Sequence, residues 1–576
     1  MSVTWREGGT SEQRQAVILA GGKGTRLRSR LRERPKPLVE ISGIPLLGHQ
    51  LQLLRKHGFT DIVLLVNYAA EQIYEYCRTF DTGEIRISII DDGEPRGTAG
   101  AVLNAAPQLA SQFIVLYGDT MLDVDLTRFW DWHSRDANAA ASLILHPNDH
   151  PQDSDLVVIN TEHRILQFHS YPRRAEHSYL PNLVNAALYI VNREALPEYD
   201  ESGPLLDFAR DLFPQMLQSG AVLRGYLSAE YIKDVGTPER LDRVNRDFSA
   251  GAIGRASLRF SKPAIFVDRD GTLNEDRGHI ASPEDLVIFD FVAPAVRRLN
   301  EAQWPTIIVT NQPVLARGEA SYHELRRIQG KLDSELARYG AYFDRVYFCP
   351  HHPHSGFPGE VSELKIKCDC RKPAPGLIYQ AQRDFNLDLA ESWFIGDSAA
   401  DIGAAAAAGI TSILVLTGLT GRNGKHSCKP DFVAKDFAAA VDFILDVYPL
   451  LACSCRPILE LIESGSGWFV AGASQFARRS LIATLKRELR RLGKSASVQH
   501  TEDWPTSPLA LQPDTVNLWE GRDATERARE AGMLRHSIWV HDSGLQDELP
   551  EAMCAAHSVN WPDGSSSDQS PGGMAA

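Results

Sequence analysis

Two aspartates separated by a single residue, Asp268 and Asp270, follow a short apolar run and precede a glycine and a threonine. Carboxylates in this arrangement suit covalent phosphoryl chemistry, in which one attacks phosphorus while the other protonates the leaving alcohol and later activates water. A turn after a strand also places both at the carboxyl edge of a sheet, where they can help to hold Mg²⁺. An acidic surface turn is the alternative interpretation of this motif taken alone.

Four further side chains have the spacing of a metal site. Cys349 and His351, then Cys368 and Cys370, supply three thiolates and one imidazole, a closed tetrahedral set that suits structural Zn²⁺. His352 and His354 are alternatives to His351, and buried free cysteines are the simpler interpretation. The eight cysteines of the chain are too few for a disulfide scaffold, which favours metal over redox chemistry.

A glycine-rich segment near the N-terminus reads AGGKGTRL over residues 20–27 and is followed by PKPL, which contains Lys36. Glycines after a strand allow main-chain N–H groups to approach a polyphosphate, and Arg26 and Lys36 can neutralise a leaving pyrophosphate. A structural turn is the alternative for the glycines alone. The predicted nucleotide contacts in this segment are Ala20, Gly21, Gly22, Gly24 and Thr25.

The elements that must position these residues are short β-branched runs that alternate with amphipathic helical patterns, which is typical of α/β proteins with a largely parallel sheet. In the first series, strands are predicted at 16–20, 61–67, 85–91 and 113–119. In the second series, they are predicted at 264–268, 306–311, 345–349, 393–397 and 412–418. A third segment begins with a strand-like run at 467–472 and a long helical stretch.

The 576 residues agree with three or four domains of about 150 residues each. Composition predicts a flexible N-terminus at 1–14 and a small-residue linker at 249–262. The predicted domains cover 15–248, 263–447 and 448–560, and a disordered tail follows at 561–576.

Residues 15–248 resemble the sugar-1-phosphate nucleotidyltransferase family, through the glycine segment with PKPL and four further motifs. These are GTAGAV from Gly97, YGD with Gly118 and Asp119, VNAALYIV around Asn185, and IKDVGTPERL with Asp234. The resemblance implies a Rossmann-like domain in which a sugar phosphate oxygen attacks the α-phosphorus of a nucleoside triphosphate and expels pyrophosphate. It also implies Mg²⁺ on Asp119 and Asp234, nucleotide contacts at Gly97 and Gly118, and a sugar contact at Asn185.

One stretch departs from that family. Many relatives carry a Glu-Lys pair before a proline to hold the sugar and its phosphate, whereas this chain has Ser170 and Tyr171 in QFHSYPRR. The hypothesis is that Arg173 or Arg174 replaces the missing lysine. An unchanged sugar-phosphate KM in the double variant Arg173→Ala, Arg174→Ala would remove it.

The second series resembles the haloacid dehalogenase phosphatases, which have a Rossmannoid fold. After DRDGT come the strand-end TNQ with Thr310, CRKPAPG with Lys372, and GDSAADI with Asp397 and Asp401. The resemblance implies that Asp268 is the nucleophile and Asp270 the general acid and base. It further implies that Thr310 and Lys372 bind the transferring phosphoryl group, and that Asp268, the Asp270 carbonyl and Asp397 bind Mg²⁺.

Within that superfamily, the cysteine and histidine set is similar to two groups, the D-glycero-D-manno-heptose 1,7-bisphosphate phosphatases and the histidinol-phosphate phosphatases. The stretch TNQPVLARGE at 310–319 contains the ARG typical of the heptose enzymes. That resemblance implies contacts to sugar hydroxyls or the distal phosphate from Asn311, Gln312, Arg317 and Arg371. Pro313 departs from the usual small residue and removes one backbone N–H that could bind phosphate.

The third segment resembles a P-loop kinase of the uridine-kinase type, in a degenerate form. Gly472 fits the start of GxxxxGK[ST], but Ala477, Arg478 and Arg479 replace the glycine, lysine and hydroxyl residue. The lost hydroxyl removes a Mg²⁺ ligand, and the added Cβ crowds the anion loop. We therefore predict a smaller P-loop-like α/β segment without catalysis, and plain packing of an amphipathic helix is an equal alternative.

The formal net charge of -14 gives no overall support for a nucleic-acid or anionic-membrane partner. No apolar run reaches the roughly 20 residues of a membrane span, and the polar start is not a secretory signal, so a cytoplasmic location is predicted. Composition does not determine an oligomeric state.

Together these resemblances predict a bifunctional enzyme of activated-heptose synthesis. Its substrates would be heptose phosphates and a nucleoside triphosphate, with GTP favoured by resemblance to heptose 1-phosphate guanylyltransferases. One alternative is a mannose 1-phosphate guanylyltransferase joined to a phosphatase of other specificity. Another is a non-catalytic sugar-nucleotide sensor or assembly protein.

Overall fold

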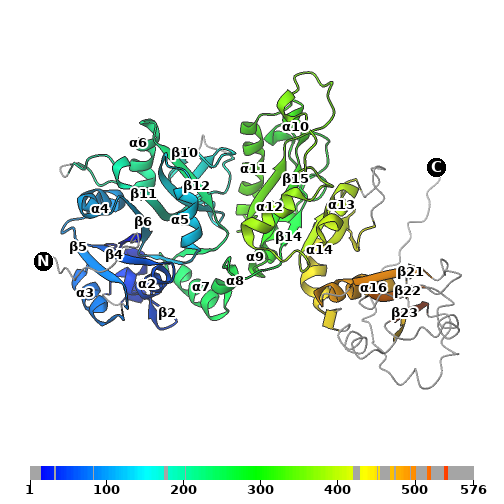
Figure 1. The fold of residues 1–576 in the computed structure, drawn as a ribbon, viewed down its shortest axis with the longest axis horizontal. Coiled ribbons are helices and arrows are strands. Elements are labelled where there is room, and N and C mark those ends of the chain that lie inside the picture. Colours follow the sequence, from blue (N-terminus) through cyan, green and yellow to red (C-terminus); the bar gives the residue numbers. More distant parts are fainter. Residues whose placement is uncertain are drawn as a thin grey trace. The chain divides into compact units, whose positions relative to one another are not determined.

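The computed structural model divides the chain into two compact units, Met1–Val441 and Asp442–Ala576. The residues that the structure describes are 14–31, 34–81, 83–173, 179–200, 203–419, 429–450, 452–453, 468–472, 475–492, 495–500, 515–520 and 537–542. Unit 1 contains both predicted enzyme domains (Figure 1). None of the described helices is both long and apolar enough to cross a membrane.

The first domain is built on a nine-stranded mixed sheet. Its strands are β1 (Arg14–Leu19), β4 (Phe59–Val66), β5 (Arg86–Asp91), β6 (Gln112–Tyr117), β8 (Ala139–His146), β9 (Leu156–Ile159), β10 (Ile165–His169), β11 (Val184–Asn192) and β12 (Val222–Leu227). The half formed by β6, β1, β4 and β5 is parallel, as predicted, and β11 joins it antiparallel to β6. The carboxyl ends of these parallel strands therefore lie at one edge, where open α/β sheets place their ligands.

Helices cover both faces of this sheet. They are α1 (Arg28–Leu31), α2 (Leu46–Lys56), α3 (Ala70–Thr79), α4 (Gly97–Ala105), α5 (Leu126–Ser134), α6 (Phe213–Gln218), α7 (Pro238–Ser249) and α8 (Ala252–Ala256). Alternate residues of β1 and β4 enter two separate apolar clusters, with Ile18 and Leu64 in one and Val17 and Val63 in the other. Helices α2 and α3 cover one face and α4 and α6 the other (Figure 1). This alternation, with a period of two residues, explains the unbroken hydrophobic runs of the central strands.

Two small antiparallel pairs complete the first domain. Strand β2 (Glu40–Ile41) pairs with β3 (Ile44–Pro45), and β7 (Thr120–Asp123) pairs with β13 (Tyr231–Asp234). In the second pair, Thr120 lies opposite Asp234, and the Val235 N–H donates to the Asp119 carbonyl at 2.9 Å. The pairing brings together two aspartates that are 115 positions apart in the sequence.

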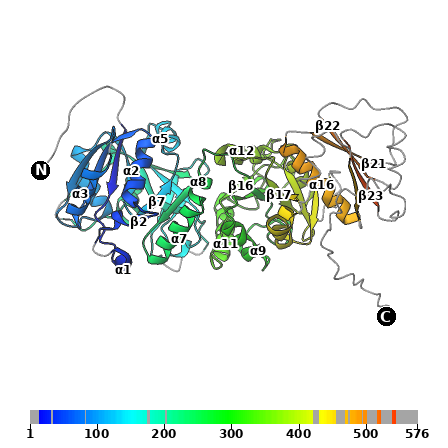
Figure 2. The same ribbon diagram turned by 90° about the horizontal axis from the view of Figure 1, so that it is seen from below.

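The second domain has a six-stranded sheet in the order β16-β15-β14-β17-β18-β19, and every pairing is parallel. Its strands are β14 (Ile265–Val267), β15 (Thr306–Asn311), β16 (Arg345–Cys349), β17 (Trp393–Gly396), β18 (Thr411–Val415) and β19 (Phe432–Ala434). Its helices are α9 (Val292–Glu301), α10 (Pro313–Ala316), α11 (Tyr322–Ala337), α12 (Gly376–Phe385), α13 (Ala399–Ala408) and α14 (Phe437–Asp442). Helix α12 lies on one side of the sheet, with α9 and α11 on the other (Figure 2).

The predicted linker at 249–262 is not a free tether, because it contains α8 and is anchored to both domains. The Leu258 N–H donates to Glu230 of the first domain at 3.3 Å, and the Asn386 side chain of the second domain donates to the Leu258 carbonyl at 2.9 Å. Arg128 of the first domain also donates to the Arg383 carbonyl of the second. Within unit 1 the two enzyme domains are therefore packed against each other.

Unit 2 contains a four-stranded parallel sheet in the order β20-β23-β22-β21. Its elements are β20 (Trp468–Gly472), α16 (Gln475–Arg491), β21 (Ser495–His500), β22 (Thr515–Glu520) and β23 (Ser537–Asp542). Helix α16 begins only two residues beyond Gly472, so Ala477, Arg478 and Arg479 are helical residues. In a GxxxxGK phosphate loop, the residue at the position of Ala477 would lie in the loop before the helix. The strand and helix order is as predicted, and the P-loop character of this segment stays a prediction, because residues 473 and 474 lie outside the described part of the chain.

Candidate active sites

The glycine segment connects the end of β1 to a single 3₁₀ turn at Thr25–Leu27. Gly24 adopts a φ of 60°, and a Cβ there would lie 2.7 Å from the Leu31 side chain and 3.2 Å from Lys36 Cβ. Glycine at this position therefore lets the loop close over the PKPL turn. The loop from Ala20 to Thr25 accordingly lies at the carboxyl end of β1, where the predicted nucleotide contacts require it.

Opposite charges meet beside this loop. Lys36 is buried, and its ammonium lies 2.5 Å from Asp119 Oδ2. A Cβ at Gly236 would lie 2.6 Å from Asp234 Oδ2 and 3.5 Å from Arg26 Nη2, which places Arg26 beside Asp234. The structure thus brings together the two aspartates and the two cations that the motifs predicted as a set.

Arg240 is a member of this site that the motifs did not identify. It lies on α7, and its Nη1 donates to both oxygens of Asp234 at 2.9 Å. The helix is positioned by Thr237, which accepts from the Arg240 N–H, and by Pro238 at its first position. The only sequence signal was an arginine three residues after a capping threonine, which is common on ordinary helices.

Two predicted sugar contacts are occupied by other parts of the protein. The Asn185 side chain donates to the Tyr189 hydroxyl at 2.9 Å and accepts from the Ala187 N–H at 3.2 Å. Arg173 donates to the carbonyls of Ser154 and Pro151, the latter at 2.7 Å. This engagement disfavours Arg173 as the substitute for the missing lysine, and Arg174 lies outside the described residues.

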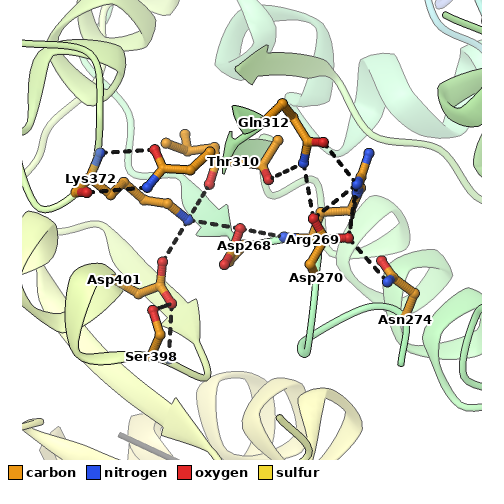
Figure 3. Close-up of polar contacts among 11 residues, drawn as sticks. Asp268, Arg269, Asp270, Asn274, Thr310, Gln312, Lys372, Ser398 and Asp401 are labelled. Atoms are coloured by element: carbon orange, nitrogen blue, oxygen red, sulfur yellow. Dashed lines mark hydrogen bonds and ion pairs between the residues drawn. The ribbon is translucent and has the colours of Figure 1, made fainter. Parts of the chain in front are cut away.

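The second site is centred on a buried ammonium held among carboxylates (Figure 3). Lys372 Nζ lies 2.7 Å from Asp268 Oδ1 and 2.6 Å from Asp401 Oδ1, and it also donates to the Val309 carbonyl at 2.8 Å. Asp268 directly follows β14, and Thr310 lies near the end of the neighbouring β15, so the parallel pairing brings them to the same edge of the sheet. Lys372 is the predicted phosphoryl ligand, and this position beside the nucleophile agrees with that role.

The second site holds more carboxylate groups than cations. Asp268, Asp397 and Asp401 are buried, and one ligand oxygen of each lies within 4.8 Å of the others. Burial, followed by repulsion from Asp401, raises the pKa of Asp268 and raises that of Asp397 to about 7. Burial acts to lower the pKa of Lys372, but Asp268 and Asp401 outweigh it and raise that pKa. Such a set of oxygen donors with excess negative charge fits a hard divalent cation.

Gly271 is required at this centre. Its φ is 82°, and a Cβ there would lie 2.5 Å from Asp397 Oδ2. The glycine of DRDGT therefore permits the turn and leaves room for the third carboxylate. Asp401 was noted only as part of a motif, yet its side chain both caps α13 through Ser398 and pairs with Lys372.

Asp270 is held by side-chain donors from three residues (Figure 3). Arg269 donates to both of its oxygens at 2.9 Å, Gln312 Nε2 donates at 3.0 Å, and Asn274 Nδ2 donates at 3.1 Å. Asp270 and Asp268 nevertheless line the same cavity, of about 670 Å³. Arg269, whose residue is 2% exposed, was not singled out from the sequence because a variable position between two aspartates carries no motif signal.

Asn311 and Gln312, predicted as sugar contacts, have their side chains engaged inside the protein. The Asn311 amide group exchanges hydrogen bonds with the main chain of Lys372, at 3.0 and 3.1 Å. Gln312 bridges Asp270, Thr310 and Arg269. Both residues line the cavity, but these contacts position the catalytic groups instead of leaving free donors for a sugar.

The predicted metal set is assembled by the long loop that follows β16. Cys370 Sγ lies 3.2 Å from Cys349 Sγ, 3.1 Å from Cys368 Sγ and 3.2 Å from His351 Nδ1. Zinc–sulfur bonds of about 2.3 Å in a tetrahedron give sulfur–sulfur edges of about 3.8 Å, so the donors are close to the required spacing. The contact with Cys349, and then burial, raise the pKa of the Cys370 thiol. His352 instead contacts the His354 main chain, so His351 is the fourth donor of this set.

Arg371 and Arg317, both predicted to contact substrate, differ in their surroundings. Arg371 lines the cavity and donates to the His351 carbonyl at 3.2 Å. Arg317 is absent from the cavity lining, and its guanidinium lies 4.2 Å from the centre of the Phe357 ring. In the structure Arg317 packs on the metal loop, and its contact with substrate stays a prediction.

Other contacts fasten the loop at the same place. Lys365 Nζ lies 4.4 Å from the centre of the Phe357 ring, and the Val361 N–H donates to the Ala316 carbonyl at 3.0 Å. A Cβ at Gly318 would lie 1.8 Å from the Gly359 carbonyl oxygen, so the two segments pack without space for a side chain. The loop in turn supplies one wall of the cavity through His352, His354 and Cys368.

We expect Arg317→Ala and Phe357→Ala each to raise the KM for a large phosphate ester by about threefold to tenfold, as loss of one cation–π contact would. The double variant should show no further increase, because both changes remove the same contact. Hydrolysis of p-nitrophenyl phosphate, which does not reach the loop, serves as the control and should keep its KM. If Arg317→Ala raises the KM by the same factor in wild type and in Phe357→Ala, Arg317 binds substrate directly.

Known proteins match both halves of unit 1. Residues 15–250 match the nucleotidyl transferase family, and residues 369–440 match the HAD-hydrolase-like family. The D-glycero-β-D-manno-heptose-1,7-bisphosphate 7-phosphatase of Yersinia pestis is 40% identical over 187 residues, which are 32% of this chain and 91% of that protein.

Two solved structures also match. HddC from Yersinia pseudotuberculosis, complexed with GMP-PN, is 26% identical and covers 41% of this chain and 100% of its own, with a TM-score of 0.35. The D,D-heptose 1,7-bisphosphate phosphatase of B. bronchiseptica, complexed with magnesium and phosphate, is 34% identical and covers 32% of this chain and 98% of its own, with a TM-score of 0.28.

The fold, the two sites and these matches define a fused enzyme, a nucleotidyltransferase domain followed by a HAD-type phosphatase domain. Through its second domain the chain belongs to the family of the D-glycero-β-D-manno-heptose-1,7-bisphosphate 7-phosphatases.

Proposed function

We propose that the second domain removes the 7-phosphate of D-glycero-D-manno-heptose 1,7-bisphosphate and that the first domain transfers GMP from GTP to the resulting heptose 1-phosphate. The observation that carries this proposal is the pairing of Asp268 and Lys372 in a domain that is 40% identical, over 187 residues, to a heptose bisphosphate phosphatase. The two reactions are consecutive, which gives the fusion a metabolic reason. The choice of GTP follows the resemblance of the first domain to heptose 1-phosphate guanylyltransferases.

In the phosphatase reaction, an Asp268 oxygen attacks the phosphorus and forms an acyl phosphate while the bond to the sugar oxygen breaks. Asp270 donates its proton to that sugar oxygen and later takes a proton from the attacking water. Lys372 and Thr310 hold the phosphoryl oxygens. Arg269, Gln312 and Asn274 orient the Asp270 carboxyl group through the hydrogen bonds described above.

In the nucleotidyl transfer, the sugar phosphate oxygen attacks the α-phosphorus of GTP and the bond to pyrophosphate breaks. The glycine loop at residues 20–25 positions the triphosphate, and Arg26 and Lys36 neutralise the charge on the departing pyrophosphate. Asp119 directly precedes β7, and Asp234 ends β13, the strand that pairs with β7. Catalysis here is positioning and charge neutralisation, with no covalent intermediate on the protein.

We assign Mg²⁺ to both sites and Zn²⁺ to the cysteine and histidine set. Asp119 and Asp234 would hold Mg²⁺ in the first domain, and Asp268, the Asp270 carbonyl and Asp397 would hold it in the second. Mg²⁺ supplies positive charge to the transferring phosphoryl groups. Asp401, which shares Lys372 with Asp268, supports the second of these sites.

The purified chain should contain about one zinc per molecule, measured by atomic absorption. Removal of the zinc by a chelator should lower the melting temperature of unit 1 by at least about 5 °C, because the loop then loses its brace. Cys368→Ser should lose the metal, whereas Cys77→Ser, at a free cysteine on α3, should retain it. Full zinc content in Cys368→Ser would contradict the assignment.

The function is tested by assaying the two half-reactions separately on the intact chain. Phosphate release is compared between heptose 1,7-bisphosphate and histidinol phosphate. Pyrophosphate release is compared between heptose 1-phosphate and mannose 1-phosphate, each with GTP, ATP, CTP and UTP. Preference for the heptose compounds with GTP supports the proposal, and preference for mannose 1-phosphate or histidinol phosphate would replace it. Absence of both products from metal-loaded protein would indicate a non-catalytic sensor.

A further inference from the structure

Unit 1 contains a second large cavity, of about 760 Å³, that shares no lining residue with the phosphatase cavity. The first domain lines it through the end of β8, through β13 and through α7 and α8. The second domain lines it through α9 and through the segments that precede β15 and β16. Because strands β15 and β16 begin there, the cavity lies at the opposite edge of the phosphatase sheet from Asp268.

The lining of this cavity has an excess of positive charge. Seven lysine and arginine side chains face five carboxylates, in a chain whose overall charge is -14. Among the described residues, no carboxylate lies within 4.0 Å of the Lys233 ammonium or the Arg246 guanidinium, and neither side chain donates a hydrogen bond.

Carboxylates in the lining do not remove this excess. Asp149 is already paired with Arg243, and Asp247 accepts from the Tyr231 hydroxyl at 2.8 Å. Burial raises the pKa of Glu230 to about 7 and that of Asp344 to about 6, which reduces their negative charge near neutral pH. The neighbouring His146 stays neutral, because burial and Lys233 lower its pKa to about 4.

The volume of this cavity and the aromatic side chains that line it indicate which class of ligand it can bind. The volume lies within the range of about 300–1,000 Å³ that is typical of small-molecule sites. Five aromatic side chains contribute to the lining, namely Tyr231, Trp304, Tyr339, Tyr342 and Phe385. Aromatic faces suit a nucleobase, and free lysine and arginine groups suit phosphate oxygens.

The cavity also lies directly behind the nucleotidyl transfer site. Lys233 and Asp234 are neighbours in β13, and successive strand side chains point to opposite faces. Asp234 is held by Arg240 of α7, the helix that supplies Arg243 and Arg246 to the cavity. One strand and one helix therefore connect the two sites.

We infer that this cavity is a second nucleotide site, which binds a nucleoside phosphate on Lys233 and Arg246 and regulates nucleotidyl transfer through β13 and α7. The site is separate from the donor-binding glycine loop, and its occupant is not consumed. A ligand that draws Lys233 toward the cavity moves Asp234 in the same strand. The effect is expected on pyrophosphate release and not on phosphate release.

The test uses GDP as the probe in equilibrium dialysis with the intact chain. Wild type should bind two molecules of GDP per chain, one at the glycine loop and one in the cavity. Arg246→Glu should weaken only the second of these, by about tenfold or more, as expected for loss of a charge-assisted contact. Arg26→Ala should weaken the other. Arg78→Gln, at an exposed α3 position outside both sites, is the matched control and should leave both unchanged.

Kinetics provide the second readout. In wild type, GDP should inhibit pyrophosphate release with a non-competitive component against GTP, and this component should vanish in Arg246→Glu while the uninhibited rate stays unchanged. Binding of a single GDP by wild type, or of two by Arg246→Glu, would overturn the inference. The dialysis count does not depend on turnover, so it tests the second site even if the proposed transferase reaction fails.

Discussion

Replacement of Asp268 with asparagine should abolish phosphate release, by roughly 10⁴-fold or more, because an amide of the same shape cannot form the acyl phosphate. Asp268 directly follows β14, with one oxygen 2.7 Å from Lys372, so its position is set by the sheet and by this ion pair. The change leaves the first domain untouched. Pyrophosphate release from heptose 1-phosphate and GTP should therefore stay at the wild-type rate.

The measurement is rapid quench with substrate labelled in the 7-phosphate. Wild type should show transient labelling of the protein, and Asp268→Asn should show none. Asp270→Asn should accumulate any label that forms, because the base for acyl phosphate hydrolysis is missing. Label on Asp268→Asn, or phosphate release from it within about tenfold of wild type, would show that Asp268 is not the nucleophile.

Replacement of Lys36 with alanine should lower the kcat of pyrophosphate release by roughly 10²–10³-fold, because the cation that meets the charge on the departing pyrophosphate is lost. Lys36 is buried, and its ammonium lies 2.5 Å from Asp119, so this cation is held in a fixed position beside the predicted metal ligand. The KM for GTP should change less than kcat. Phosphate release at the second site should be unchanged.

The matched control is Lys56→Ala, at the end of α2, where the ammonium lies 3.7 Å from Asp123 at the surface. Such an exposed pair contributes little, and the rate should stay within about threefold of wild type. Steady-state assays with heptose 1-phosphate and GTP measure both variants. A loss of less than about threefold in Lys36→Ala would show that the PKPL turn does not contact the leaving group.

The parallel parts of both sheets followed from the sequence because their hydrophobic runs were clear, whereas β8–β12 and β19 were not predicted. Runs such as residues 61–67 and 306–311 are buried on both faces, which β-branched residues tolerate and amphipathic helices do not. The metal set also followed from spacing, because few chemistries need thiolates and imidazole so close together. Nothing comparable marked α8, where small residues that predict a linker form a short helix.

Roles inside the phosphatase site were harder to predict, because motifs identify residues but not the direction of their side chains. Asn311 and Gln312 follow a strand end, as substrate ligands do, yet both are occupied in positioning Lys372 and Asp270. Arg317 was assigned to substrate through the resemblance of TNQPVLARGE to the heptose enzymes, and the sequence did not show that its guanidinium packs on Phe357, 40 positions later. Such long-range contacts between loops leave no local pattern in the sequence.

The partners of the first site show the same limit. Arg240 approaches Asp234 only because β13 and α7 fold back together, and an arginine in a helix carries no distinctive signal. Arg173 occupied the right stretch of sequence for a phosphate ligand, but main-chain carbonyls at 151 and 154 accept its hydrogen bonds. Whether an arginine is free to bind a ligand becomes known only when the packing around it is known.

The central claim is that one chain carries out both steps in sequence, and a single reaction mixture tests it. Intact protein is given heptose 1,7-bisphosphate as the only sugar, together with GTP, and phosphate and pyrophosphate are followed over time. Phosphate should appear first, and pyrophosphate should follow after a lag and approach equal amounts. Pyrophosphate without a lag, or its appearance at the wild-type rate with Asp268→Asn, would contradict the account.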